Sequence, residues 1–269
     1  MDVASQNPTS RFSDRVENYV KYRPTYPPEV IACLKENCGL TDESIVADVG
    51  SGTGLLTKLF LENGNRVIAI EPNREMREAA EKLLAGEENL TSVAGTAEDT
   101  GLPTGSVDFI VAGQAFHWFD RAKSKAEFQR ILRPGGWVAL IWNERETGSS
   151  PFLIGYEALL QKQSTDYQRV NHTNLGEDVF REFYAPGIYQ VSTFLNSQHF
   201  DFEGITGRCL SSSYVPNAGQ PGHEAMIAGL KTLFETYQTG GFVSLEYQTR
   251  VYHGQFEGPA LQPIGPSAL

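Results

Sequence analysis

The sequence is poor in the residues that build disulfide frameworks and nucleic-acid surfaces. It has only 3 cysteines, Cys33, Cys38 and Cys209, and this odd number without a C-x-x-C pair gives neither a disulfide framework nor a zinc pattern. Lys and Arg number 22 against 33 Asp and Glu, so a net charge of −11 leaves no excess of basic residues for a duplex. We therefore expect buried free thiols and no nucleic-acid partner.

Long hydrophobic runs are also missing. No apolar stretch approaches the roughly 20 residues of a membrane span. The opening residues are polar and lack a charged leader followed by an apolar segment. We expect a cytoplasmic protein without a membrane partner, and 269 residues suffice for one sizeable core in a single domain.

The most informative stretch that is present is IVADVGSGTG, from Ile45 to Gly54. An apolar run interrupted by Asp48 ends in glycines at alternate positions, and a helical pattern starts at Leu55. Glycines let the backbone approach a ligand closely, and the helix start presents free N–H groups. The stretch predicts a small-ligand cradle at the carboxyl end of a buried strand.

The spacing of the glycines narrows the choice of ligand. A dinucleotide fingerprint needs a third glycine at the position that Leu55 occupies. Asp48 would repel a pyrophosphate and suits a ligand with an amine. The next strand, Arg66 to Ile70, ends in Glu71, at the distance expected for a carboxylate that binds ribose hydroxyls. Together these residues predict a nucleoside site without a pyrophosphate.

Strands and helices alternate along most of the chain. Near-continuous apolar strands between helices indicate a parallel sheet covered on both faces. The expected strands are Leu90 to Ala94, Val107 to Ala112, Trp137 to Trp142, Ile188 to Phe200 and Phe242 to Tyr252. The expected helices start after Asn73 and run over Ala122 to Leu132 and Gly222 to Tyr237.

We expect a single domain over residues 1–269 with additions around its core. A cap rich in tyrosine and proline (1–43) should cover the carboxyl edge of the sheet, and the ligand-binding core follows (44–143). A helical insertion (144–187), the C-terminal strands and helix (188–252) and a loose tail (253–269) complete the chain.

Five motifs occur in the order seen in a known family: VADVGSGTG, Glu71-Pro72 followed by Met76, GTAEDTGLP, VDFIVAGQAFHWFD and LRPGGWVALIW. In these motifs the chain resembles class I S-adenosylmethionine-dependent methyltransferases, in particular the small-molecule branch (methyltransferase type 11, trans-aconitate methyltransferase-like). The resemblance covers about Phe12 to Asn143 and continues more loosely in RCLSSSY, Arg208 to Tyr214.

The resemblance implies a Rossmann-like α/β fold. Its sheet would have seven strands, mostly parallel, with an antiparallel last strand and helices on both faces. The implied cofactor is S-adenosyl-L-methionine, with S-adenosyl-L-homocysteine as product and no metal.

The resemblance also implies which residues hold the cofactor. Gly50, Ser51 and Gly52 would pass under its methionine part, Asp48 would approach its amino group, and Glu71 would hold the ribose hydroxyls. Met76 would lie against the adenine or else pack in the core, while Glu98 would read the adenine or else be a solvated loop charge. Arg23 would pair with the cofactor carboxylate or belong to an ordinary extended segment. The remaining implied cofactor contacts are Tyr19, Pro72, Ala97 and Gln114.

The acceptor side is less defined. His117 is a candidate general base because its ordinary pKa lies near working pH, and a structural hydrogen bond or substrate positioning is the alternative. The expected substrate-binding residues are Tyr22, Tyr26, Trp118, Arg145 and Tyr214. No Asp/Asn-Pro-Pro-aromatic motif follows the fourth strand, which again disfavours a nucleic-acid substrate and leaves a small-molecule methyl acceptor.

Two questions stay open at this point. A carboxylate acceptor needs no base and would be oriented by arginines such as Arg23, Arg121 or Arg145, whereas a hydroxyl or amine needs His117 or a tyrosine. A nucleotide-dependent oxidoreductase is opposed by Leu55 and by the lack of a Tyr-x-x-x-Lys pair. A cofactor-binding protein without catalysis is the other alternative.

Overall fold

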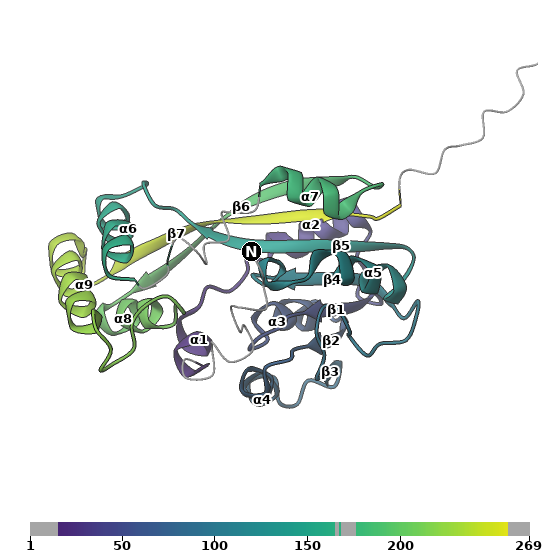
Figure 1. The fold of residues 1–269 in the computed structure, drawn as a ribbon, viewed down its shortest axis with the longest axis horizontal. Helices are drawn as coiled ribbons and strands as arrows, with labels where there is room; N and C mark the ends of the chain where they lie inside the picture. Colours follow the sequence, from purple (N-terminus) through teal and green to yellow (C-terminus); the bar gives the residue numbers. More distant parts are fainter. Residues whose placement is uncertain (1–15, 165–166, 168–175, 258–269) are drawn as a thin grey trace, which may run out of the picture.

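The computed structural model describes residues 16–164, 167 and 176–257 of the chain. Its centre is a seven-stranded sheet in the order β3-β2-β1-β4-β5-β7-β6 (Figure 1). The strands are β1 (Ile45–Val49), β2 (Arg66–Ile70), β3 (Leu90–Val93), β4 (Val107–Gly113), β5 (Leu132–Arg145), β6 (Tyr189–Phe200) and β7 (Val243–Gly254). The helices are α1 (Val16–Tyr22), α2 (Glu29–Cys38), α3 (Leu55–Glu62), α4 (Arg74–Leu83), α5 (Arg121–Ile131), α6 (Pro151–Gln163), α7 (Glu177–Tyr184), α8 (Phe202–Leu210) and α9 (His223–Tyr237).

The strand directions confirm the predicted Rossmann-like topology. Strands β1 to β5 pair in parallel, and the last strand, β7, pairs antiparallel with both β5 and β6. The order of the strands reverses between β1 and β4. Strands β2 and β3 are added on one side of β1, and β4 and β5 are added on its other side. Ligands of open α/β sheets bind at this switch point, beyond the carboxyl ends of the strands.

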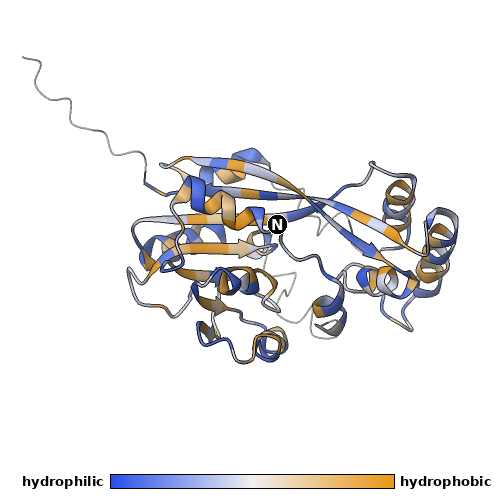
Figure 2. Ribbon diagram, turned by 180° about the vertical axis from the view of Figure 1, so that it is seen from behind, coloured by the Kyte–Doolittle hydropathy of each residue, from blue (hydrophilic) through white to orange (hydrophobic). Residues whose placement is uncertain are grey.

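Helices cover both faces of the parallel part of the sheet, as predicted. On one face, Val30 and Leu34 of α2 and Phe60 of α3 pack on sheet residues such as Val46 and Val111. On the other face, α5 and α7 pack through aromatic side chains, among them Phe128, Phe180 and Phe183. Helix α2 therefore belongs to the layer over the sheet rather than to the expected cap. The central strands are hydrophobic, and the helices alternate between hydrophobic and hydrophilic residues (Figure 2).

A second lobe lies beyond the parallel strands (Figure 1). The long strands β5, β6 and β7 continue into it, and α6, α8 and α9 pack on their far ends. The lobe has its own core, which includes Leu160, Ile205, Met226, Leu230 and Leu245, all with no exposed surface. Because the same strands run through both halves, lobe and sheet form one continuous framework.

Some sequence-based boundaries were wrong. Helix α8 was not predicted, because Gly204 and Gly207 weaken its helical pattern. In the structure Asp201 caps this helix, since its side chain accepts a hydrogen bond from the Gly204 N–H (2.7 Å). The helical insertion predicted for residues 144–187 is not one unit. Its first helix, α6, packs in the lobe, and its second helix, α7, packs on the sheet. His253 and Gly254, assigned to the tail, are buried in β7, while residues 258–269 of that tail lie outside the described residues.

The three cysteines are free and buried, as predicted. Across the described part of the chain, no helix has the length and hydropathy needed to cross a membrane.

Candidate active site

The loop after β1 has the geometry that its glycines suggested. Gly50 and Gly52 adopt positive φ values of 70° and 58°. A Cβ atom on Gly50 would lie 2.7 Å from the Ala115 Cβ, so a larger residue has no room there. The N–H groups of Gly50 and Ser51 both donate to the carbonyl of Ile70 (2.8 and 3.1 Å), which joins this loop to the end of β2.

Asp48 is fully buried beside this loop. Its Oδ2 accepts a hydrogen bond from the Thr57 hydroxyl (2.6 Å), while its Oδ1 has no partner among the described residues. The pKa of Asp48 is raised to about 7, mainly by burial; the hydrogen bond from Thr57 opposes this increase, and the nearby charge of Glu71 adds to it. A buried carboxylate with one unused oxygen is suited to a ligand that brings a cation or an N–H donor.

Glu71 is fixed at the end of β2 by two backbone groups. Its Oε2 accepts from the Gly52 N–H (2.9 Å) and its Oε1 from the Asn73 N–H (2.8 Å). Pro72 lies between Glu71 and Asn73 in the chain. Burial raises the pKa of Glu71, and these N–H groups act in the opposite direction. Each carboxylate oxygen keeps further acceptor capacity for a ligand hydroxyl.

The other expected adenine contacts also lie around this loop. Met76 is buried, and its methyl group lies 3.5 Å from the position of a Gly52 Cβ, so the side chain packs between α4 and the loop. Ala97 is buried after β3. Glu98 is not simply a solvated charge, because its Oε1 accepts from the Asp120 N–H (2.8 Å) and joins the β3 loop to the start of α5.

A cavity of about 420 Å³ lies between the sheet and the lobe. It brings together eight of the residues that the sequence singled out: Tyr19, Arg23, Tyr26, Gln114, His117, Trp118, Arg145 and Tyr214. Tyr22 does not line it; its ring lies against Gly207 of α8, and its hydroxyl donates to Glu203 (3.2 Å). Arg121 lies elsewhere, in a separate surface depression between α5 and α7.

The floor of the cavity follows β4. Gly113 has no room for a side chain because the Tyr26 hydroxyl occupies that space. Gln114 adopts a φ of 57°, which is uncommon for a residue other than glycine and often occurs at functional sites. A 3₁₀ turn (Phe116–Trp118) then presents His117, whose ring lies 4.7 Å from that of Trp118, centroid to centroid.

Two arginines line the lobe side of the cavity, Arg208, which is buried, and Arg23, which is half-buried. Arg23 donates to the Ser211 carbonyl (2.9 Å), and Arg208 donates to the Tyr247 hydroxyl (3.2 Å) and to Ser212 (3.3 Å). Among the described residues, neither guanidinium forms an ion pair with a carboxylate, and the Arg23 Nε has no partner at all. Burial, followed by the nearby charge of Arg208, lowers the pKa of Arg23.

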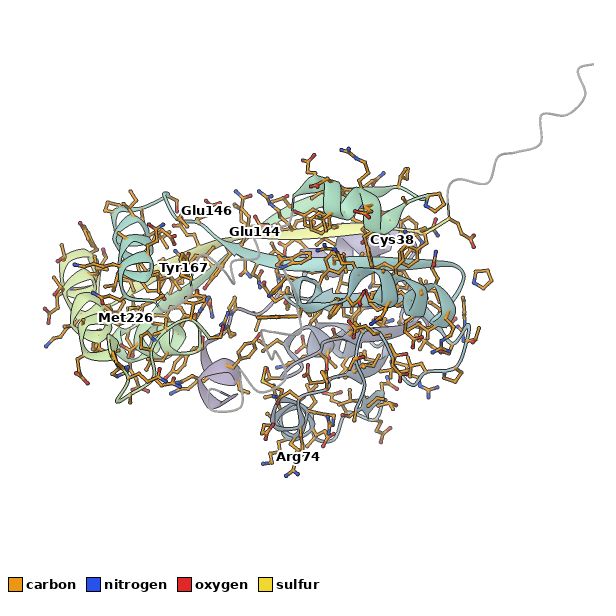
Figure 3. All side chains as sticks on the ribbon, viewed as in Figure 1. Cys38, Arg74, Glu144, Glu146, Tyr167 and Met226 are labelled. Carbon is orange, nitrogen blue, oxygen red and sulfur yellow. The ribbon has the colours of Figure 1, made fainter. Side chains whose placement is uncertain are left out.

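The third arginine of the cavity is already neutralised. Arg145 donates to Glu157 of α6 (2.5 Å) and to the Tyr167 hydroxyl (3.2 Å), and Glu157 also accepts from Tyr167 (2.7 Å). The Tyr214 ring packs on Tyr167 with a centroid distance of 4.8 Å. Tyr167 and Glu144 lie where the lobe joins the sheet (Figure 3).

Sequence reasoning assigned no role to Arg208, Asn143, Glu144, Glu157 or Tyr167, all of which line the cavity. Arg208 stood in the RCLSSSY stretch, but its helix was not expected. Asn143 and Glu144 reach the cavity because β5 continues towards the lobe, and Glu157 and Tyr167 reach it from α6 and the residues after it; neither arrangement has a local sequence signal.

The fold and this site define the class of protein. A seven-stranded sheet with one antiparallel strand, a glycine loop after β1 and a carboxylate after β2 are features that this chain shares with class I S-adenosylmethionine-dependent methyltransferase domains. The family model described as methyltransferase domain matches residues 47–140, so this part of the chain is similar to that family.

Curated relatives agree with this assignment. The chain is 37% identical over 146 residues to an uncharacterized methyltransferase of Mycobacterium tuberculosis, a match that covers 54% of this chain and 57% of the relative. It therefore spans little more than half of that relative. An uncharacterized methyltransferase of Schizosaccharomyces pombe is 28% identical over 228 residues, covering 84% of this chain and 87% of that protein.

Solved structures show the same fold. A protein of Anaeromyxobacter dehalogenans assigned as a type II methyltransferase superposes with a TM-score of 0.69 at 22% identity, over 88% of this chain and all of that chain. The [4+2]-cyclase SpnF superposes with a TM-score of 0.56 at 12% identity, over 95% of this chain and 97% of that one. Because a cyclase shares the fold, the reaction has to be argued from the site.

Proposed function

We propose that this protein transfers a methyl group from S-adenosylmethionine to a small anionic acceptor, most simply a carboxylate. The proposal rests on one observation above all: two arginines, half-buried Arg23 and buried Arg208, line the cavity without a carboxylate partner among the described residues. The proposed setting is cytoplasmic, without nucleic acid or membrane.

The residues around the β1 loop fit the cofactor. The unused Oδ1 of buried Asp48 suits the ammonium group of its methionine part, and Glu71 has acceptor capacity for ribose hydroxyls. Gly52 leaves the loop backbone open, since only the Met76 methyl lies within 4 Å of its Cβ position. Arg23 is placed to pair with the cofactor carboxylate, as an arginine on a buried anion commonly does.

The charge of the cavity favours an anionic acceptor. Two like charges buried side by side repel each other, and in a medium of low dielectric this repulsion is several-fold larger than in water. One cofactor carboxylate can neutralise one of them. The remaining guanidinium, Arg208, would then bind an anionic group of the acceptor, because its neighbours Tyr247 and Ser212 are neutral.

The chemistry asked of the chain is mainly positioning. S-adenosylmethionine, when bound, supplies a methyl group on a positive sulfur that a nucleophile can accept directly. A carboxylate is ionised at neutral pH, so the arginines need only orient it and the tyrosine walls need only exclude water. For a hydroxyl acceptor, His117 lines the cavity and would take the proton at its imidazole.

The first experiment is calorimetric titration with S-adenosylmethionine, S-adenosylhomocysteine and NADH. Binding of the first two at micromolar concentration and none of NADH supports the proposal, whereas binding of NADH alone, or of nothing, contradicts it. A methyl-transfer assay with a panel of small carboxylic acids, phenols and amines then identifies the acceptor. Cofactor binding without any transfer would favour a non-catalytic binding protein.

Charge variants test the acceptor site. We expect Arg208→Gln to raise the KM for a carboxylic acid on the order of tenfold to a hundredfold, since a charge-assisted hydrogen bond is lost. Arg208→Lys should recover part of this loss. Arg133→Gln is the matched control, because Arg133 pairs with Asp108 away from the cavity. An unchanged KM in Arg208→Gln would rule out the anionic subsite.

A further inference from the structure

One buried amide connects the parts that surround the cavity. Asn143, near the end of β5, is only 4% exposed. Its Nδ2 donates to the Thr25 carbonyl (3.2 Å), and its Oδ1 accepts from the Thr249 hydroxyl (2.5 Å) and from Asn196 (3.2 Å). Its backbone carbonyl accepts from the Gln114 side chain (3.0 Å). This one residue therefore joins β4, β5, β6, β7 and the N-terminal segment 22–26.

The N-terminal segment 22–26 depends on such hydrogen bonds for its position. Asn196 also donates to the Thr25 carbonyl (2.8 Å), and Gln198 donates to the Tyr22 carbonyl (3.2 Å). Arg23 lies between these two anchored carbonyls, and Tyr26 follows them against Gly113. A change at Thr25 would move both Arg23 and Tyr26 relative to the cavity.

Gln114 depends on the same residue from the other side. Its positive φ is an uncommon conformation that surrounding contacts must maintain. Its side-chain amide is held by the Asn143 carbonyl, and its N–H donates to the Ile141 carbonyl (2.9 Å). Residue 143 thus contacts both parts: its side-chain amide bonds to the N-terminal segment 22–26, and its backbone carbonyl bonds to Gln114 on the floor of the cavity.

We propose that Asn143 is a positioning residue for methyl transfer: it holds Arg23 on the N-terminal segment 22–26 and Gln114 after β4 in one arrangement around the cavity. The inference rests on the proposed function. An amide meets both requirements of the position, because it donates to Thr25 and accepts from Thr249 and Asn196 at once. An ionised carboxylate would accept but not donate, and an apolar side chain would do neither.

The test compares Asn143→Asp with the parent chain from pH 5.5 to pH 8.5. The groups that hydrogen-bond to Asn143, on Thr25, Gln114, Asn196 and Thr249, are all uncharged. The nearest charged residues along the strand, Glu144 and Arg145, are paired with Arg250 and Glu157 and are present in the parent as well. Arg23, also present in both chains, is the charge carried by the N-terminal segment 22–26.

At high pH the ionised Asn143→Asp side chain cannot donate to Thr25. We expect its affinity for S-adenosylhomocysteine and its kcat to fall on the order of tenfold, because one hydrogen bond is lost and the ionised oxygen faces the Thr25 carbonyl, which keeps the bond from Asn196. As the pH falls and the new carboxyl group gains a proton, it can donate again, so the ratio of variant to parent should rise towards one. A ratio that does not change with pH would overturn the proposal.

Two further variants keep the test decisive if Asn143→Asp is poorly folded. Thr249→Val preserves shape but removes one donor to Asn143, and a several-fold loss of S-adenosylhomocysteine affinity at an unchanged melting temperature would support the proposal. Parent-like affinity in Thr249→Val together with parent-like affinity in Asn143→Leu would refute it. Failure of the parent chain itself to bind S-adenosylhomocysteine would instead refute the proposed function.

Discussion

At the scale of single residues, the cofactor side of the site relies on carboxylates that are kept away from water. Asp48 has no exposed surface, and burial raises its pKa to about 7. This arrangement disfavours the charged form in the empty site and favours it once a cation is present. Asp48, which suits a cationic ligand, therefore lowers the free energy of unfolding of the ligand-free protein at neutral and higher pH.

Asp48→Asn should separate these two effects. The folded-state pKa of about 7 lies above the ordinary value of 3.8, so the stability contributed by Asp48 is full below about pH 4 and is lost as the pH rises through 7. At pH 8 we expect the ligand-free variant to be more stable than the parent by on the order of 4 kcal/mol. Thermal unfolding at pH 5 and pH 8 measures this difference.

The same substitution should weaken cofactor binding. Parent affinity for S-adenosylmethionine should increase from pH 6 to pH 8 as Asp48 ionises, whereas the affinity of Asp48→Asn should stay low and vary little. Asp42→Asn, at an exposed turn, is the control and should match the parent in both measurements. A variant that binds like the parent at pH 8 would show that Asp48 does not meet the amino group.

At the scale of elements, small residues decide where helices meet. Gly207 of α8 leaves space for the ring of Tyr22, and Gly113 at the end of β4 leaves space for the hydroxyl of Tyr26. Both tyrosines flank Arg23 in the chain. The close approach of α1 to α8, and of the following segment to β4, therefore depends on two missing side chains.

Gly207→Ala should displace Tyr22 and with it the end of α1. Overpacking of this kind costs about 1–3 kcal/mol, and we expect a lower melting temperature together with weaker S-adenosylhomocysteine binding, because Arg23 follows Tyr22 directly. The comparison is Gly148→Ala, where nothing lies within 4 Å of the new Cβ. Equal cofactor affinity in the two variants would show that α1 does not position Arg23.

At the scale of the whole molecule, the cavity exists because two cores are joined by shared strands. The sheet side supplies Gln114 to the cavity and holds Asp48 and Glu71 beside the loop after β1, while the lobe supplies Arg208 of α8 to the cavity. Figure 1 shows β5 and β7 running through both halves, with α1 lying between the lobe and the parallel sheet. The proposed contacts to cofactor and acceptor therefore come from separately packed parts of one chain.

Leu230→Ala should loosen the lobe more than the sheet. Leu230 is fully buried in the lobe core, and its truncation costs about 2–5 kcal/mol. We expect faster hydrogen exchange in α6, α8, α9 and the far ends of β6 and β7, with S-adenosylhomocysteine still bound and acceptor turnover reduced. Leu195→Ala, at a side chain that is 87% exposed, should leave exchange unchanged. Uniformly faster exchange, including β1 and β4, would mean that the two cores unfold as one unit.

The sequence by itself determined the proposed cofactor half of this protein. Asp48 lies near the end of β1, Gly50 and Gly52 follow that strand and Glu71 follows β2, so local pattern and the rule that parallel strands end at one edge were enough to place them together. The alternation of strands and helices likewise gave the sheet and its covering helices.

Only the tertiary structure decided the acceptor half. Arg208 and Glu157 come from helices that lie far apart in the chain, and Asn143 gains its role through partners on three other strands and the N-terminal segment 22–26. No local period marks such contacts, because they arise where β5, β6 and β7 extend past the sheet and a separate core forms on their ends. The physical reason is that a ligand cradle on one strand and one turn is a local feature, whereas a cavity between two cores depends on long-range packing.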